Sequence, residues 1–237
     1  MELVLKGIKK SFGSKSVLKE ASFSFEKGRI YGLLGRNGAG KTTLFNCLSG
    51  EIGFEEGTAA LKDEMGREQP LTPERVGYVF SSPVLPDFLT GYEFIKFFVD
   101  LHKDKIKDSM STDDYFKLLK LSQDDQHRLI KGYSHGMKNK LQLLLSLIVR
   151  PPVILLDEPL TSFDVVVAHE IKELIKSLKK DHIIIFSTHI LQLATDMCDD
   201  LIILNEGRLE MVDSAMLKSK DFEAGIIELL KDDEANA

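Results

Sequence analysis

This sequence has few cysteines and no excess of positive charge. The 237-residue chain has two cysteines, Cys47 and Cys198, which form neither a CxxC pair nor a disulfide framework. This usage favours a reducing cytosol over secretion. The formal net charge is −6 at pH 7. The composition therefore gives no support to nucleic-acid binding, which usually requires a basic surface.

Long apolar runs are also missing. The longest, near Leu143–Val149 and Ile183–Phe186, fall well short of the roughly 20 residues that a membrane-spanning helix needs. The first residues, Met1–Phe12, hold only the run Leu3–Leu5 before a cluster of lysines, which predicts no signal peptide. If the protein serves a membrane, we expect it to do so through a partner.

The pattern of apolar residues predicts an α/β protein. With 43% hydrophobic and 29% charged residues, the composition is that of an ordinary globular chain, long enough for a real core. Residues 3–30 alternate apolar and polar side chains, which predicts strands with one buried face. The apolar run Val153–Leu156 predicts a central parallel strand. Further strands are predicted at Ile30–Leu34, Val76–Phe80, Ile183–Ser187 and Leu201–Leu204, and short edge strands within 51–75.

Helical spacing of apolar residues dominates the segment Asp87–Arg128. With a long helix at Lys138–Val149, it predicts a helical subdomain at about residues 87–150, inserted into a single domain that covers residues 1–237. Thr42–Ser49 and residues 164–179 are also predicted to be helical. A short polar tail at about 213–237 is expected to be helical with a frayed end.

A glycine-rich segment, Gly35–Thr42, matches the phosphate-binding pattern G-x-x-x-x-G-K-[ST]. It follows a predicted strand and opens a predicted helix, which separates it from a merely structural glycine turn. Glycines let backbone N–H groups point at phosphate oxygens, and the helix N-terminus adds positive potential. Lys41 is predicted to contact the β- and γ-phosphates, and Thr42 to ligate Mg²⁺. The predicted nucleotide-binding residues here are Gly35, Arg36, Asn37, Gly38, Ala39, Gly40, Lys41, Thr42 and Thr43.

Two carboxylates, Asp157 and Glu158, follow the apolar run Val153–Leu156. A carboxylate at the end of a buried strand beside a phosphate loop can hold Mg²⁺, directly or through water. Glu158 is then placed to accept a proton from an attacking water. The alternative, a core strand that ends at a solvated acidic turn, loses weight once the phosphate loop is present. Nucleotide binding alone does not choose among kinases, GTPases, motors and transporters.

Over nearly its whole length the sequence resembles the ATP-binding cassette (ABC) family. Tyr133–Met137 is similar to the signature L-S-G-G-Q, and Thr161–Asp164 occupies the place of the D-loop. Ser187–His189 is similar to the switch-histidine segment, and Phe12 lies where the family has an aromatic that stacks on adenine. Each match alone is weak, since a lone Phe12 is more often core and a lone His189 a polar strand end. Their order along the chain makes coincidence negligible.

The resemblance implies a P-loop NTPase fold of ABC type, with a mixed-sheet core, an antiparallel β edge and an inserted helical subdomain. It implies ATP and Mg²⁺ as ligands and a catalytic set of Lys41, Glu158 and His189, with His189 sensing the γ-phosphate and steadying Glu158. Asp164 is implied to communicate across a dimer.

The signature also has a physical interpretation. Ser134 and Gly136 precede a helix predicted to begin near Lys138, and such an N-terminus is an anion site. A second γ-phosphate site makes sense if it serves another subunit's nucleotide. The family resemblance implies a head-to-tail dimer with a second copy or a related subunit, in which Ser134 and Gly136 face the partner's ATP.

Three positions depart from the family pattern. Ser81 stands where the family usually has a glutamine that reaches Mg²⁺ and the attacking water. Its shorter side chain could act through a bridging water, so it is only a weak candidate metal ligand. His135 and Met137 replace the usual glycine and glutamine of the signature, but the backbone donors depend more on Ser134 and Gly136.

The resemblance implies the ATPase subunit of an ABC transporter, which powers a separate transmembrane permease from the cytoplasmic face of the membrane. The stand-alone domain and its motifs are most similar to ABC-2-type exporter ATPases. Five aromatics within Pro83–Leu101 are expected mainly to pack inside the helical subdomain, and some to receive a permease helix: Phe88, Tyr92, Phe94, Phe97 and Phe98. Two alternatives are a soluble non-transport ABC ATPase and a nucleotide-gated binding module with little hydrolysis.

Overall fold

The computed structural model describes residues 1–106, 110–160, 165–213 and Ile226. Its strands are β1 (Glu2–Phe12), β2 (Lys15–Glu26), β3 (Arg29–Leu34), β4 (Glu56–Lys62), β5 (Glu68–Pro70), β6 (Val76–Val79), β7 (Val153–Asp157), β8 (Ile183–Thr188), β9 (Asp200–Asn205) and β10 (Arg208–Met211). Its α-helices are α1 (Lys41–Ser49), α2 (Gly91–Leu101), α3 (Thr112–Leu118), α4 (Gln123–His127), α5 (His135–Val149), α6 (Val165–Leu178) and α7 (Leu191–Met197). Within the described ranges, no helix combines the length and the apolar character needed to cross a membrane.

Contacts along the chain separate two compact units. The first unit holds Met1–Tyr78, Pro152–Glu158 and Lys179–Ala237, and the second holds Val79–Pro151 and Pro159–Leu178. The expected helical range 87–150 lies within the second unit, which also includes α6. Nearly all of the expected tail lies outside the described residues.

The strand that precedes the phosphate loop, β3, lies inside a six-stranded sheet of order β10-β9-β3-β8-β7-β6. β3 runs parallel to β8 and β9, and β7 runs parallel to β8. Parallel strands bring their carboxyl ends to one edge of a sheet, where α/β proteins bind ligands. The topology therefore brings the segments after β3, β7 and β8 together.

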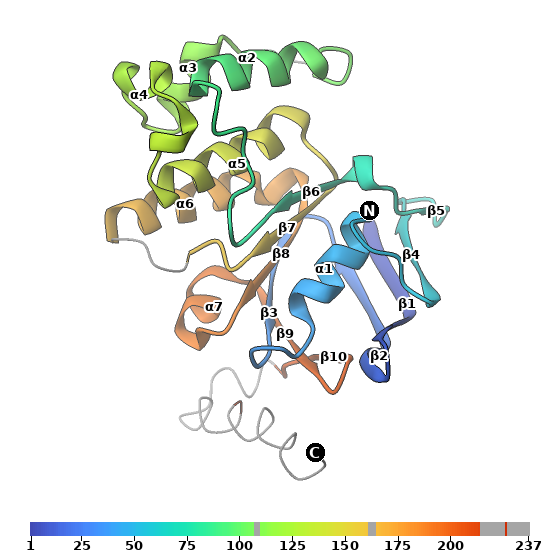
Figure 1. The fold of residues 1–237 in the computed structure, drawn as a ribbon. Helices are drawn as coiled ribbons and strands as arrows, with labels where there is room; N and C mark the ends of the chain where they lie inside the picture. Colours follow the sequence, from blue (N-terminus) through green and yellow to red (C-terminus); the bar gives the residue numbers. More distant parts are fainter. Residues whose placement is uncertain (107–109, 161–164, 214–225, 227–237) are drawn as a thin grey trace. The chain divides into compact units, whose positions relative to one another are not determined.

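The core of the first unit lies between this sheet, α1 and an antiparallel sheet of order β2-β1-β4-β5 (Figure 1). β7 and β8 are buried along their whole length, as their apolar sequences predict. Tyr31 is a core residue, as predicted, and its hydroxyl accepts the Glu26 N–H at 2.7 Å. The cluster joins α1 to both sheets through Leu44, Phe45 and Leu48 of α1, Leu33, Leu155 and Ile185 of the parallel strands, and Leu3, Leu5 and Phe25.

The second unit contains α2 to α6. α5 begins at His135, three residues before the predicted start, because the Ser134 hydroxyl accepts the Met137 N–H at 3.2 Å and caps the helix. α5 is joined to α6 by an ion pair of 2.5 Å between Lys140 and Glu170.

The aromatics of the segment Pro83–Leu101 do not all pack inside this unit. Tyr92, Phe94 and Phe98 are half-buried. Phe88 and Phe97 are 78% and 60% exposed. Most of the five side chains are therefore at least partly packed, as expected, and Phe88 and Phe97 remain on the surface.

Candidate active site

The phosphate loop joins β3 to α1 and needs glycine at two of its positions. Gly38 and Gly40 have φ of 83° and 108°, a region that residues with a Cβ rarely adopt. A Cβ on Gly40 would also lie 2.8 Å from Cγ1 of Val17. The loop leads directly into the N-terminus of α1 at Lys41, which gives it the positive end of a helix dipole.

The Lys41 side chain is buried inside the loop and is 6% exposed. Its ammonium group donates to the carbonyl oxygens of Gly35 at 2.7 Å and Arg36 at 3.1 Å. Burial lowers the pKa of Lys41 below its ordinary value, and the negative charges of Glu158 and Asp157 act in the opposite direction. The loop thus holds a cation, and phosphate oxygens can take the place of the carbonyl oxygens that bind it.

Asp157, at the end of β7, is 3% exposed and accepts two hydrogen bonds. Thr42 Oγ1 donates to its Oδ2 at 2.8 Å, and Ser187 Oγ donates to its Oδ1 at 2.6 Å. A hydroxyl and a carboxylate are the oxygen ligands that Mg²⁺ prefers, so the donor set fits this ion. Burial, together with the negative charge of Asp157, raises the pKa of Tyr78 above its ordinary value.

Glu158 follows in a left-handed backbone conformation, with φ of 48°. Its N–H donates to Ser187 Oγ at 3.0 Å, and Nδ1 of His189 lies 3.0 Å from its Oε1. Such conformations in residues other than glycine concentrate at functional sites, where surrounding contacts hold them. The structure thus brings the predicted pair Glu158 and His189 into direct contact.

A hollow of 320 Å³ lies along the phosphate loop, and Glu158 forms part of its wall. Phe12, at the end of β1, lines it and is 52% exposed. Nζ of Lys10 lies 5.3 Å from the centroid of that ring. The complete lining consists of Phe12, Lys15, Val17, Asn37, Gly38, Gly40, Lys41, Thr42, Thr43 and Glu158.

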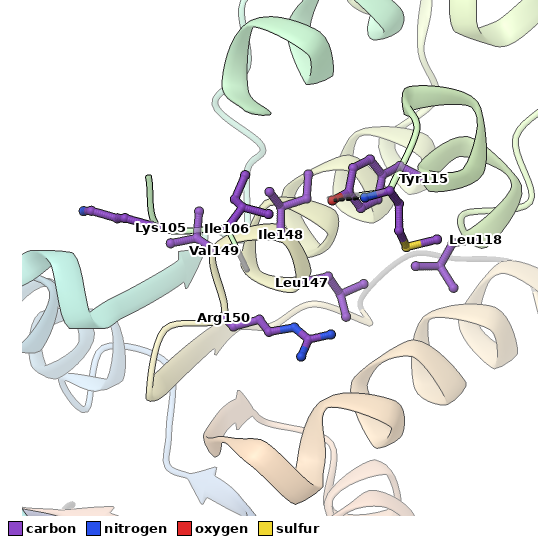
Figure 2. Close-up of a pocket in the computed structure, with 9 residues that line it drawn as sticks. Lys105, Ile106, Tyr115, Leu118, Leu147, Ile148, Val149 and Arg150 are labelled. Carbon is purple, nitrogen blue, oxygen red and sulfur yellow. Dashed lines mark hydrogen bonds between the residues drawn. The ribbon is translucent and has the colours of Figure 1, made fainter. Parts of the chain in front are cut away.

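A second hollow, of 350 Å³, lies in the second unit, which we call the helical unit because it contains α2 to α6 (Figure 2). Two cationic side chains, Lys105 and Arg150, are among its lining residues, and Figure 2 shows them pointing away from one another. Polar groups that converge on one point are typical of ligand sites, and these two do not converge. The chemistry therefore belongs to the hollow of the phosphate loop.

The remaining predicted residues lie in the second unit or outside the described residues. Ser81 is exposed and follows Phe80, whose backbone N–H and C=O both pair with the side-chain amide of Gln142 at 3.4 Å. Ser134 is exposed at the start of α5, and Gly136 is buried in its first turn. Asp164 lies outside the described residues.

Two neighbours of Asp157 have no role in the sequence-based interpretation. Tyr78 is part of a strand that reads as ordinary apolar sequence. Ser187 begins the segment that resembles the switch-histidine segment, and it is the first hydroxyl after four apolar residues in β8. Neither observation says which groups the hydroxyl contacts.

Comparison with known sequences gives a consistent result. The profile of the family described as "ABC transporter" matches residues 18–161. The ABC transporter ATP-binding protein YdbJ of Bacillus subtilis is 32% identical, over 98% of this chain and 76% of its own length. A fluoroquinolones export ATP-binding protein of Mycobacterium tuberculosis is 34% identical, over 85% and 66%. A sulfate/thiosulfate import ATP-binding protein of Bacillus cereus is 28% identical, over 90% and 61%.

Solved structures share the fold. An ATP-binding subunit of an ABC transporter superposes with a TM-score of 0.80 at 23% identity, over 98% of this chain and all of the other. The ATP-binding cassette MJ0796, a dimer in a post-hydrolysis state bound to ADP and Pi, superposes with a TM-score of 0.72 at 21% identity, over 90% and 99%. The chain therefore belongs to the ABC transporter family, as an ATP-binding protein with the ABC ATPase fold.

Proposed function

We propose that the hollow of the phosphate loop binds ATP with Mg²⁺ and that Glu158 is the general base for hydrolysis. The contact of 3.0 Å between His189 and Glu158, at the wall of that hollow, carries the proposal. A base must lie within reach of the proton that it accepts and must be oriented there. His189 supplies the orienting contact.

The phosphate loop supplies binding. Backbone N–H groups and the N-terminus of α1 face anionic oxygens, and Lys41 exchanges its two carbonyl partners for the β- and γ-phosphates. Phe12 stacks on the adenine, since an exposed ring beside the loop offers a flat apolar face. Residues 35–43 thus hold the triphosphate, and Phe12 the base.

Thr42 and Asp157 would hold Mg²⁺, which neutralises negative charge on the phosphate oxygens during phosphoryl transfer. Their hydrogen bond of 2.8 Å already places the two ligand oxygens together. Glu158 accepts the proton of the attacking water, and His189 keeps the carboxylate aimed at it. Ser81, a weaker candidate, would reach this ion through a water.

Composite sites in a head-to-tail dimer complete the proposal. Ser134 caps α5, so this helix presents an exposed serine at its N-terminus to an anion. We assign Ser134 and Gly136 to the γ-phosphate of the partner subunit's ATP, and Asp164 to communication across the dimer. The dimeric structure of MJ0796 with ADP and Pi supports the formation of a dimer. ATP then favours the closed dimer because it binds that state better.

A separate permease is the proposed partner, and an ABC-2-type exporter the proposed complex. Exposed apolar side chains on the segment between β6 and the end of α2 suit a helix from a membrane protein: Val84, Phe88, Phe97 and Leu101. The fluoroquinolones export relative supports the direction, whereas the import relative keeps it a proposal. The protein would act at the cytoplasmic face of the membrane through this permease.

The test of the ATPase assignment compares the wild type with Glu158→Gln. The variant keeps the shape of the side chain and removes the base, so ATP binding persists and turnover falls at least about 100-fold. Size-exclusion chromatography with ATP should show an accumulated dimer. Glu173→Gln, an exposed carboxylate of α6, is the matched control and keeps wild-type turnover. Equal turnover in the wild type and Glu158→Gln would remove Glu158 from the reaction.

The permease assignment has its own test. Phe88→Ser and Phe97→Ser should leave the ATPase rate of the isolated subunit unchanged. They should reduce the extra turnover that appears when the subunit is reconstituted with its permease. Full stimulation in both variants would place the permease contact elsewhere.

A further inference from the structure

A single buried hydroxyl connects both carboxylate residues of the candidate site. Ser187, in β8, is 0% exposed. A buried hydroxyl needs hydrogen-bond partners, and Ser187 has both kinds. It donates to Oδ1 of Asp157 at 2.6 Å and accepts the N–H of Glu158 at 3.0 Å. Ser187 therefore contacts two adjacent residues that have different proposed tasks.

The first consequence concerns the orientation of Asp157. Thr42 binds Oδ2 of this carboxylate from α1, and Ser187 binds Oδ1 from β8. With one hydroxyl on each oxygen, the carboxylate cannot rotate without losing a hydrogen bond. Groups behind a metal ligand commonly fix its orientation in this way.

The second consequence concerns Glu158. Its φ of 48° is unfavourable for a residue with a side chain, so its peptide orientation needs support from neighbours. Ser187 holds the backbone N–H, and His189, two residues further along, contacts the carboxylate at 3.0 Å. The end of β8 thus holds Glu158 at both its backbone and its side chain.

We propose that Ser187 is a positioning residue that sets the metal-binding orientation of Asp157 and the base orientation of Glu158 together. It acts through its hydrogen bonds to these two residues. The inference rests on the proposed function, because it assumes that Asp157 serves the metal and Glu158 the water.

The test uses Ser187→Ala, with Ser187→Thr as the conservative variant that keeps a hydroxyl. Ser146→Ala, which removes another buried serine hydroxyl from α5, is the matched control. Three quantities are measured: ATP turnover against Mg²⁺ concentration, the melting temperature, and Mn²⁺ affinity. The last is read by electron paramagnetic resonance on protein that holds a non-hydrolysable ATP analogue.

Ser187→Ala should lower kcat and weaken Mn²⁺ binding, each by about 10- to 100-fold, the usual effect of losing a group behind a metal ligand. Ser187→Thr should recover part of both, and Ser146→Ala should change neither. Wild-type kcat and Mn²⁺ affinity in Ser187→Ala would overturn the inference. So would equal losses in Ser146→Ala, which would indicate a general packing effect. Failure of the proposed function can be told apart from failure of this inference. The first would appear as unchanged turnover in Glu158→Gln, whereas the Mn²⁺ affinity of Ser187→Ala decides the role of Ser187 in either case.

Discussion

Thr42 Oγ1 donates a hydrogen bond of 2.8 Å to Oδ2 of Asp157. The two residues are 115 positions apart in the sequence, and this bond joins the first turn of α1 to the end of β7. It places the hydroxyl of an exposed residue beside a buried carboxylate at the edge of the sheet where β3, β7 and β8 end.

Thr42→Ala should therefore raise the Mg²⁺ concentration needed for half-maximal turnover by about 10-fold or more, because it removes a ligand oxygen and a partner of Asp157. The measurement is turnover against Mg²⁺ at saturating ATP. Thr195→Ala, which removes a hydroxyl bonded within α7, is the control. An unchanged Mg²⁺ curve in Thr42→Ala would place the ion elsewhere.

Lys41→Ala should abolish tight ATP binding. Losing one charge-assisted contact weakens binding by about 10- to 100-fold, and Lys41 is assigned to two phosphates. Affinity for a fluorescent ATP analogue with Mg²⁺ present is the measurement, and Lys176→Ala, which changes an exposed side chain of α6, is the control. If Lys41→Ala binds the analogue as well as the wild type, the assignment of the phosphate loop is wrong.

Ser134→Arg should prevent ATP-dependent dimerisation, because its bulk fills the site for the partner's γ-phosphate. Both Ser134→Arg and Ser134→Ala lose the hydrogen bond that caps α5, which is worth about 1 kcal/mol. Because alanine leaves the site open, Ser134→Ala should dimerise better than Ser134→Arg.

Mixing Ser134→Arg with Lys41→Ala is the sharper test, since each mixed dimer holds one intact composite site. An equal mixture should recover up to about a quarter of wild-type turnover. Normal turnover by Ser134→Arg monomers at every concentration contradicts shared sites.

Ser81→Gln should raise basal turnover or lower the Mg²⁺ requirement, because a longer amide reaches the ion without a bridging water. Ser81→Ala should lower turnover modestly. The permease should accelerate the wild type most, by ordering residues 81–86. Two Mg²⁺ curves identical to that of the wild type would show that Ser81 is only a turn residue.

Glu170→Gln should destabilise the helical unit at neutral pH by about 2 kcal/mol, because buried Lys140 loses its charged partner. The bond to Lys140 holds the pKa of Glu170 below its ordinary value of 4.5. A lowered folded pKa gives stability that is present above pH 4.5 and is lost as the pH falls through the folded value. Urea unfolding should show a difference between variant and wild type that shrinks below pH 4.5. A difference that is constant from pH 7 to pH 3 contradicts this origin, and Glu173→Gln is the exposed control.

The sequence predicts the buried strands and the phosphate loop well because these depend on local patterns. A strand formed by an apolar run such as Ile183–Phe186 has apolar side chains on both faces, so both faces are expected to be buried. Two elements were not predicted. α7 has seven residues and no side-chain cap. β10 has four residues and follows a two-residue turn, Glu206-Gly207, in which both residues have positive φ.

The contacts of the candidate site are only partly local. The family resemblance predicts the pairing of His189 with Glu158. Nothing in the sequence indicates that Ser187 bonds both Asp157 and Glu158, because that depends on the register between β7 and β8, in which Asp157 pairs with Ser187. Similarly, Phe97 lies at a helical spacing typical of packed residues, yet it is exposed. Periodicity says which residues share a face and not what covers that face.

The position of β3 between β8 and β9 has a consequence for the order of events during synthesis. The phosphate loop is complete once residue 43 has been made, but both strands that flank β3 come from residues 183–205. A nascent chain that ends before residue 183 has the loop without either neighbour of the strand that supports it. Contacts of such long sequence separation form slowly. We therefore expect the phosphate loop to bind ATP only after residues 183–205 have been made and have paired with β3.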